Sequence, residues 1–437
     1  MSLFDDAFKN IKDTVDYGLR LISDEEIRLG VTGLSRGGKS AFITSLVNLV
    51  SKFGDSEVSP YLSRFKAYTR GDIIYGGIAR PRDLSIGSFP YNEAISSLYG
   101  EPAVWPKATD NVSEIRLALK VKNKSWYSSK PYDLYLDIWD YPGEWLMDLM
   151  LLEKNYEEFS NTVKEHLNRI GTVASAKNWI EAVNQLDPDA PLNEIALSKA
   201  VSLYKEWLIN CKQQGFAFIV PGRFVLPGNL LGAPILEFIP WLGKEVQNPN
   251  SNNTLYAELR ARYEAYRKQV VQKFYEDCFS KLDRQIVLID CLRALKGGRE
   301  NFFDVNATLD ILMNNFNYGS SNFLTRLFAP KIDKVMFAAT KADLVTNDNH
   351  QNLRMLLTSL VNQAQSRVLG EGGHTEFAVI SSIRATQCKH LKNKNFDGQV
   401  LLTDYEDDGA FFPGTVPQRW SPENMEFFSE TVLFKGC

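Results

Sequence analysis

The run GLSRGGKS at residues 33–40 constrains this chain most, because it fits the pattern G-x-x-x-x-G-K-[ST] of a phosphate-binding loop. A short apolar run at 27–31 precedes it and a helix-like run at 41–50 follows it, which is the strand-to-helix turn that such a loop requires. Glycines let successive backbone N–H groups point at phosphate oxygens, and the helix N-terminus adds the positive end of its dipole. The pattern predicts an α/β P-loop domain that binds a nucleotide.

Individual residues of this loop have expected roles. Lys39 would reach the β- and γ-phosphates, and the Ser40 hydroxyl would ligate Mg²⁺. Arg36 has two interpretations, since it either supplies positive charge to the transition state from within the loop or faces solvent on the loop crest. The predicted nucleotide contacts in this segment are Gly33, Ser35, Arg36, Gly37, Gly38, Lys39, Ser40 and Ala41.

Charge and cysteine usage exclude several classes of function. The formal net charge of −4, from 49 basic and 53 acidic residues, argues against a general nucleic-acid binder. The five cysteines are scattered without C-x-x-C spacing, which supports neither a disulfide framework nor a zinc site and favours the cytoplasm. The most apolar segment, 215–242, contains Arg223, Glu237 and four prolines, so it does not predict a membrane-spanning helix.

Hydrophobic periodicity gives the order of elements along the chain. Apolar residues spaced by three or four within the first 23 residues predict an amphipathic helix, which we expect to pack on its own domain. Short apolar strands that alternate with helices predict a mainly parallel, doubly wound sheet. The expected elements are a hairpin at 114–121 and 132–139, a helical stretch at 145–281, and buried strands at 286–289, 335–339 and 377–380.

A second motif, D-x-x-G, follows the strand that ends at residue 139. Asp140 is the expected Mg²⁺ ligand there, acting through water, and the Gly143 N–H would sense the γ-phosphate. Asp137 is the rival for the metal role, although the spacing favours Asp140. Thr109 lies between the two motifs and fits the threonine that closes over the metal, with a simple loop threonine as the alternative.

The third motif separates GTP from ATP. An apolar strand leads into Thr340, Lys341 and Asp343, which match the [NT]-K-x-D pattern that reads guanine. A carboxylate accepts hydrogen bonds from guanine N1–H and the 2-amino group, whereas adenine offers neither and would leave Asp343 unpaired. A later strand runs into Ser382 and Ile383, where we expect the loop whose backbone N–H meets guanine O6.

These segments together resemble one known family. The runs GLSRGGKS, WPKATD, DYPGEW and TKAD, in this order and with a long helical stretch, resemble the YcjX-like family of bacterial stress-associated GTP-binding proteins. The resemblance implies a cytoplasmic protein that binds GTP or GDP and acts near the inner membrane during stress. The loop also resembles that of guanylate-binding and atlastin-type GTPases, whose arginine at the position of Arg36 supplies charge to the reaction. The contacts implied by the family pattern are Gly33, Gly38, Lys39, Ser40, Thr109, Asp140, Thr340, Lys341 and Asp343.

The expected architecture is a Ras-like G domain interrupted by helices. Its expected parts are an amphipathic helix at 1–23, a G domain at 24–145 and 284–390, a helical insertion at 146–283 and a C-terminal segment at 391–437 that packs on the G domain. The expected reaction is Mg²⁺-dependent hydrolysis of GTP to GDP and phosphate, with Lys39, Arg36, Thr109 and Gly143 as catalytic residues. Glu144 stands where small GTPases often carry a water-positioning glutamine, so turnover is expected to be slow.

Several alternatives stay open at this point. An ATPase of the same fold and a nucleotide-loaded scaffold with little turnover share the phosphate loop. A membrane-associated module would use the first 22 residues, through peripheral association with the inner membrane rather than a transmembrane segment. A homodimer paired across the nucleotide face is plausible by analogy with the arginine-loop GTPases. The protein effector is unknown.

Overall fold

The computed structural model describes residues 25–34, 37–54, 65–123, 130–170, 176–316, 332, 334–370, 374–392, 397–403 and 410–421. The amphipathic helix predicted at 1–23 and the loop residues Ser35 and Arg36 lie outside the described residues. The chain forms two compact units. The first consists of the chain up to Gly30 with Ser40–Ala108 and Val112–Asp140, and the second of Val31–Lys39, Thr109–Asn111 and everything from Tyr141 onward.

The first unit is built on antiparallel strands. Within it the strand order is β2-β4-β5-β1, and the short β3 pairs in parallel with β4. The pairing of Val121 with Tyr132 and of Ser113 with Asp140 confirms the predicted hairpin. Its elements are β1 (Glu25–Gly33, which continues into the second unit), α2 (Lys39–Val50), α3 (Lys66–Thr69), β2 (Ile73–Ala79), β3 (Gly87–Ser88), α4 (Tyr91–Tyr99), β4 (Ser113–Val121) and β5 (Tyr132–Asp140).

In the second unit the strand order is β1-β6-β7-β8, and β6, β7 and β8 pair in parallel. Ile289 pairs with Ala339, and Ala339 pairs with Val379, so the carboxyl ends of three strands meet at one edge. The α/β class with a mainly parallel sheet and the three predicted strands are confirmed. The elements outside the helical insertion are β6 (Arg284–Ile289), α12 (Cys291–Lys296), α13 (Gly298–Phe316), β7 (Lys334–Ala339), η7 (Ala342–Leu344), η8 (Asn347–Asn349), α14 (His350–Leu360), α15 (Asn362–Gly370) and β8 (His374–Val379).

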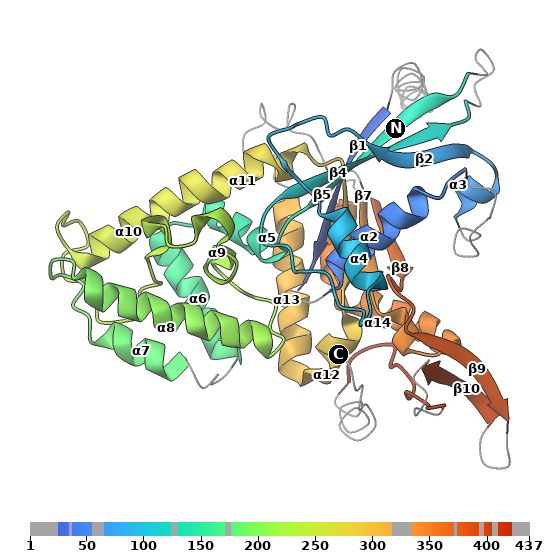
Figure 1. The fold of residues 1–437 in the computed structure, drawn as a ribbon. Helices are drawn as coiled ribbons and strands as arrows, with labels where there is room; N and C mark the ends of the chain where they lie inside the picture. The colour runs from blue at the N-terminus through green and yellow to red at the C-terminus, as the bar shows by residue number, and fades with distance from the viewer. Residues whose placement is uncertain are drawn as a thin grey trace, which may run out of the picture. The chain divides into compact units, whose positions relative to one another are not determined.

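The predicted helical stretch is also confirmed, as the green-to-yellow part of Figure 1 shows. Its interior is aromatic, because Trp179 stacks on Trp207 at 5.3 Å between ring centroids and Tyr204 lies 4.7 Å from Trp179. Its elements are α5 (Glu144–Asp148), η2 (Leu149–Glu153), α6 (Tyr156–Ile170), α7 (Ala176–Asn184), α8 (Glu194–Gln213), α9 (Gly222–Val225), η3 (Gly228–Leu230), η4 (Pro234–Leu236), α10 (Leu255–Tyr266), the π-helical η5 (Arg267–Val271), α11 (Gln272–Asp277) and η6 (Phe279–Lys281).

A buried carboxylate ties these helices to α13. Asp304, 1% exposed, accepts hydrogen bonds from the backbone N–H groups of Ala217 at 2.6 Å and Phe218 at 3.0 Å. Burial raises the pKa of Asp304, and it lowers the pKa of the neighbouring His166 to about 3. His166 is therefore neutral at physiological pH, so this contact uses fixed hydrogen bonds rather than a titrating switch.

A two-stranded hairpin, β9 (Thr386–Lys392) and β10 (Asp397–Thr403), follows the last strand of the sheet. No sequence pattern predicted this hairpin. Its Gln399 side chain accepts a hydrogen bond from the Asp348 N–H at 3.1 Å, and the Val416 N–H donates to Asn349 at 2.9 Å.

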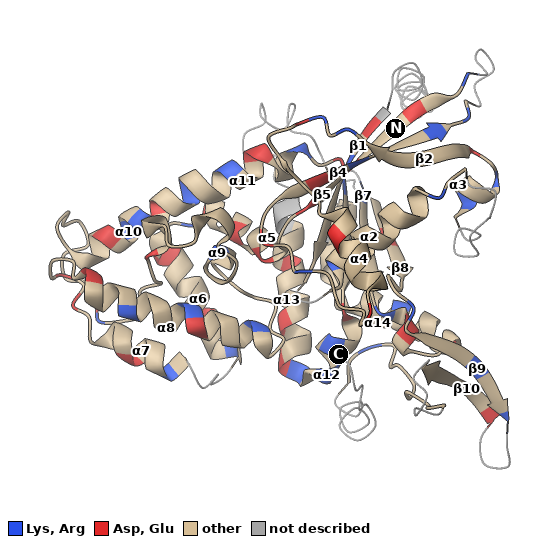
Figure 2. Cartoon of the chain, in the orientation of Figure 1, with Lys and Arg blue, Asp and Glu red and all other residues tan. Residues whose placement is uncertain are grey.

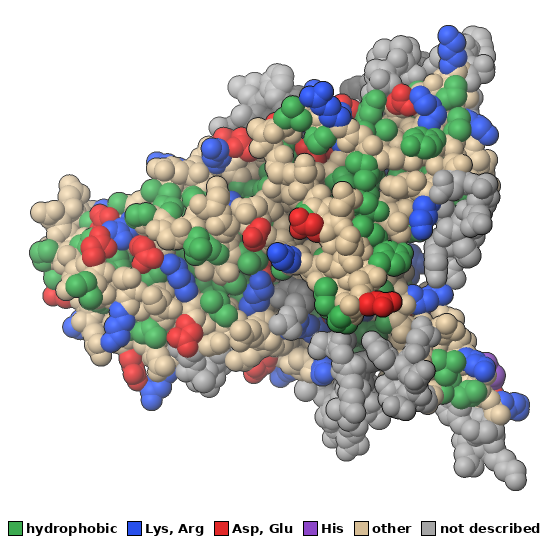
Figure 3. Space-filling model, viewed as in Figure 1, with side chains coloured by type: hydrophobic (Ala, Val, Ile, Leu, Met, Phe, Trp, Pro, Cys, Tyr) green, Lys and Arg blue, Asp and Glu red, His purple; other side chains and the backbone are tan. Residues whose placement is uncertain are grey.

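Charges of both signs are interspersed on the helices. Figure 2 shows Lys and Arg alternating with Asp and Glu along α8, α10 and α11, and Figure 3 shows hydrophobic side chains dispersed among polar ones on the face in view. Within the described ranges, every helix is too short or too polar to cross a membrane.

Candidate nucleotide-binding site

The phosphate loop leaves β1 at the point where two backbones approach closely. The Leu34 N–H donates to the Leu288 carbonyl at 3.2 Å, and the Gly37 N–H donates to the Leu34 carbonyl at 2.9 Å. A Cβ on Gly37 would lie 3.0 Å from the Leu288 oxygen, and Gly38 has a positive φ of 77°. These two glycines are therefore required by the turn itself, because a side chain at either position would crowd or strain it.

The lysine of the phosphate loop points toward the D-x-x-G segment in this structure. The Lys39 ammonium donates a hydrogen bond to the backbone carbonyl of Tyr141. Tyr141 is fully buried, and its hydroxyl donates to the Gln285 side chain at 2.8 Å. The carbonyl that receives the lysine is thus held in place by a buried tyrosine anchored on β6.

Gly143 packs against the start of the phosphate loop. A Cβ at this position would collide with the carbonyl oxygen of Gly33 and would lie 3.1 Å from Thr32 Oγ1. Thr32 is 1% exposed, and its hydroxyl has no hydrogen-bond partner among the residues that the structure describes. The backbone of the D-x-x-G glycine therefore lies directly against the start of the phosphate loop.

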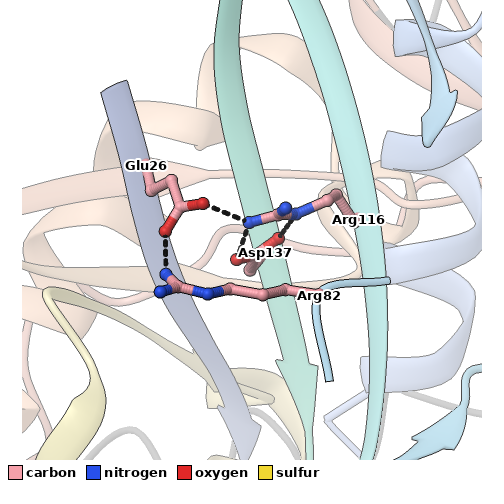
Figure 4. Close-up of polar contacts among 4 residues, drawn as sticks. All are labelled: Glu26, Arg82, Arg116 and Asp137. Atoms are coloured by element: carbon pink, nitrogen blue, oxygen red, sulfur yellow. Dashed lines mark hydrogen bonds and ion pairs between the residues drawn. The ribbon is translucent and has the colours of Figure 1, made fainter. Parts of the chain in front are cut away.

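The two candidate metal carboxylates, both in the first unit, have different surroundings (Figure 4). Asp137 accepts hydrogen bonds from Arg116 at 2.6 and 2.9 Å, and Arg116 also donates to Glu26 at 2.8 Å. Arg82 pairs with the other oxygen of Glu26. Asp137 is committed to this ion-pair network, which leaves Asp140, 2% exposed at the end of β5, as the better candidate.

The segment that carries Thr109 passes from the first unit into the second. Within the first unit, the Ser40 hydroxyl donates to the Lys107 carbonyl at 3.3 Å. Within the second unit, the Asn111 side chain accepts from the Asn229 N–H at 3.3 Å. Thr109, half-buried, lies between these two contacts along the chain, and Ala41 is buried in the first turn of α2.

The T-K-x-D segment lies at the carboxyl edge of the second unit's sheet. The Thr340 N–H donates to the Ile289 carbonyl at 3.0 Å, which ties the segment to the end of β6. Lys341 has a left-handed backbone with φ 59°, and its ammonium pairs with Asp290 at 2.9 Å. This left-handed residue turns the chain sharply after β7 and directs the next residues back toward β8.

Asp343 is oriented by the loop that follows β8. Its Oδ1 accepts a hydrogen bond from the Ser381 hydroxyl at 2.9 Å, and its Oδ2 accepts one from the Ala385 N–H at 3.1 Å. The predicted Ser382 and Ile383 lie between these two partners along the chain, half-buried. The sequence analysis missed Ser381, although the first serine of the pair after the apolar strand was the available signal.

Residues in α8, in α10 and at the two ends of α9 hold Glu144 and the rest of α5. The Glu144 carboxylate pairs with Lys212 of α8 at 2.6 Å. Asp148 accepts hydrogen bonds from the Gly222 N–H at 2.7 Å and the Tyr266 hydroxyl at 2.6 Å, and burial raises its pKa to about 6. Trp145 donates its indole N–H to the Leu226 carbonyl at 2.8 Å. The helix that follows D-x-x-G is therefore fixed at both ends.

The donor set fits a nucleotide with a hard cation. Glycines 37 and 38 shape a turn of backbone amides, which is the chemistry that binds phosphate. Hydroxyl and carboxylate oxygens at Ser40 and Asp140 are the ligand type that Mg²⁺ prefers. Within the described part of the chain, no three His, Cys, Asp or Glu side chains gather into an all-protein metal cluster.

Comparisons with known proteins find relatives over nearly the whole chain. The profile of the YcjX-like family, DUF463, matches residues 27–433. The chain is 38% identical to the Ras-like GTPase YcjX of Escherichia coli K12, over 96% of this chain and 93% of that protein. It is 36% identical to the Ras-like GTPase YcjX of Shewanella oneidensis, over 98% of this chain and 93% of that protein. The P-loop G domain predicted from the sequence is consistent with both relatives.

Proposed function

The chain belongs to the YcjX-like family, and from that membership we propose that it is a GTPase that binds GTP or GDP with Mg²⁺ and hydrolyses GTP to GDP and phosphate. The observation that carries the proposal is the carboxylate of Asp343, held by Ser381 and the Ala385 N–H at the carboxyl edge of a parallel sheet. Ligands bind at that edge in open α/β sheets.

Guanine selection follows from the acceptor character of Asp343. Two carboxylate oxygens can receive the N1–H and 2-amino group of guanine, while adenine would leave a polar group unpaired. Lys341 would cover the base with its stem, and Thr340 supports the turn. The backbone N–H of Ser382 or Ile383 would meet guanine O6. Ser381 is the residue that fixes the carboxylate for this task.

The phosphates would lie over the turn at Gly37 and Gly38, with Lys39 exchanging the Tyr141 carbonyl for phosphate oxygens. Lys39 and Arg36 would supply positive charge as the transition state develops. Ser40, Thr109 and Asp140 would hold Mg²⁺, which would neutralise phosphate charge. The Gly143 N–H and Thr109 would order on the γ-phosphate, which makes the segments around them the nucleotide-sensitive switches.

The wider role rests on resemblance rather than on the geometry of the site. The family resemblance implies a nucleotide switch in a bacterial stress response, in the cytoplasm, with peripheral association with the inner membrane. A homodimer is expected only by analogy with the arginine-loop GTPases, and the protein effector is unknown. Slow turnover is supported by Glu144, whose carboxylate replaces the water-positioning glutamine of small GTPases.

The proposal is tested by phosphate release from GTP and from ATP, with Lys39→Ala as the control. We expect Mg²⁺-dependent release from GTP that Lys39→Ala abolishes, and little release from ATP. Equal rates with both nucleotides would favour the ATPase of the same fold. Release no faster than that of Lys39→Ala would favour the nucleotide-loaded scaffold.

A further inference from the structure

Glu144 occupies a constrained place beside the phosphate loop. It directly follows Gly143, whose backbone packs on the Gly33 carbonyl. On its other side, its own carbonyl lies so close to Gly222 that a Cβ there would collide with it. The backbone of Glu144 is therefore fixed between the phosphate loop and the helical insertion, and only its side chain is free to choose a direction.

A negatively charged carboxylate in that position would repel a bound nucleotide. A nucleoside triphosphate carries several negative charges, and like charges placed close together in a partly buried site repel strongly. In the structure the Glu144 carboxylate, 11% exposed, is paired with the Lys212 ammonium, 24% exposed, at 2.6 Å. A pair of this exposure is shielded from salt far better than a surface ion pair.

Lys212 is itself held firmly. It lies in the last turn of α8, which ends where Gly215 adopts a positive φ of 95°. The carbonyl of Gln214 accepts a hydrogen bond from Asn301 of α13 at 2.6 Å, and that of Gln213 accepts one from Arg293 of α12 at 3.3 Å. The lysine is thus presented to Glu144 from a helix end that is anchored next to β6.

The attachment of α5 does not depend on this ion pair. Asp148 accepts hydrogen bonds from the Gly222 N–H and the Tyr266 hydroxyl, and Trp145 donates to the Leu226 carbonyl. The Arg223 guanidinium also lies over the Trp145 ring, 3.1 Å from its centroid. Four contacts therefore keep α5 on the insertion when Lys212 is removed, which gives the lysine a function separable from folding.

We propose that Lys212 is a positioning residue that neutralises Glu144 and keeps its carboxylate turned toward the insertion, so that the site accepts a triphosphate. The helical insertion then contributes directly to the discrimination between GTP and GDP, because only the γ-phosphate would meet a released Glu144. This inference rests on the proposed binding of guanine nucleotides and adds a residue outside the motifs that define it.

Calorimetric titration with GDP and with a non-hydrolysable GTP analogue, on the full chain, tests the proposal. We expect Lys212→Ala to weaken binding of the analogue about tenfold and to change GDP binding by less than about twofold. The double variant Lys212→Ala with Glu144→Gln should recover the affinity for the analogue, because the repelling charge is gone. Glu144→Gln alone should bind the analogue as well as the wild type.

Lys205→Ala is the matched control, since Lys205 lies on the same helix and pairs with Glu237 at 2.9 Å within the insertion. It should leave the ratio of the two affinities unchanged. Equal weakening of both nucleotides by Lys212→Ala, or no recovery in the double variant, would overturn the proposal. Failure of the wild type to bind either nucleotide would instead overturn the proposed function. A Lys212→Ala variant that does not fold is replaced by Lys212→Met, which keeps the apolar stem.

Discussion

Asp343 and Ser381 hold each other through two hydrogen bonds, although they come from different loops. The Asp343 N–H donates to Ser381 Oγ at 2.7 Å, and the Ser381 hydroxyl donates to Asp343 Oδ1 at 2.9 Å. The backbone and the side chain of Asp343 are thus oriented by one serine. A carboxylate that must meet two donors on a rigid base gains from such preorganisation, because little freedom is lost on binding.

Ser381→Ala should therefore weaken GDP binding about tenfold, since the carboxylate loses its main orienting donor. Calorimetric titration with GDP measures the change. Ser382→Ala is the matched control, because the role proposed for residue 382 uses its backbone N–H. An unchanged affinity in Ser381→Ala would contradict the orienting role.

Gly143→Ala should destabilise the protein by about 1–3 kcal/mol and weaken binding of a GTP analogue, because the added Cβ overlaps the Gly33 carbonyl. Thermal unfolding and analogue titration measure the two effects. Gly370→Ala is the control, since a Cβ there meets nothing within 4 Å. Wild-type stability and binding in Gly143→Ala would show that the D-x-x-G segment does not press on the phosphate loop.

The titration of Asp148 should make the free energy of unfolding depend on pH. Burial raises the pKa of its carboxyl from 3.8 to about 6, so the folded state binds the proton more tightly than the unfolded state. The contribution of this group to stability is fully present below about pH 4 and is lost as the pH rises to about 6. The expected loss is about 3 kcal/mol in the free energy of unfolding.

Asp148→Asn isolates this effect, because an amide does not titrate. Urea unfolding of both proteins between pH 4 and pH 7 measures the free energy of unfolding. That of the variant should increase relative to that of the wild type as the pH rises through this range. Comparing the two proteins cancels other titrating groups, such as Glu114, whose pKa burial raises to about 7. If the free energies of unfolding of the wild type and Asp148→Asn changed equally with pH, the raised pKa of Asp148 would be contradicted.

Arg116→Met should cost about 3–5 kcal/mol of stability, because it leaves the Asp137 carboxylate buried without its partner. Lys120→Met, on the same strand, removes the exposed ion pair with Asp133 and should cost less than about 1 kcal/mol. Urea unfolding compares the two variants. Equal losses of stability in the two variants would mean that Asp137 does not depend on its ion pair with Arg116. Asp137 would then again be a rival of Asp140 as a metal ligand.

Local patterns predicted the parts of the fold that depend on short stretches of chain. The phosphate loop, the hairpin and the buried strands each have a signal within about ten residues, and the structure places β1, β4, β5, β6, β7 and β8 where those signals lie. The edge strand β2 and the β9–β10 hairpin were not predicted, because their burial depends on neighbours far away in the sequence rather than on their own periodicity.

The candidate site, like the fold, could be predicted from local sequence patterns only in part. The D-x-x-G spacing favoured Asp140 over Asp137, but the physical reason, the pairing of Asp137 with Arg116 from the neighbouring strand, depends on the fold. The prediction of the guanine loop missed Ser381, because the end of β8 is set by the pairing of Ala339 with Val379. The partner of Glu144, Lys212, gave no local signal at all, since only the folded insertion brings it there.

The most direct test of the central claim is the ratio of GDP to ADP affinity, measured by calorimetry on nucleotide-free protein and on Asp343→Asn. The account predicts that the wild type binds GDP about a hundredfold or more tightly than ADP, and that Asp343→Asn loses most of this preference. Equal affinities in the wild type, or an undiminished preference in the variant, would contradict the assignment of Asp343 as the reader of guanine.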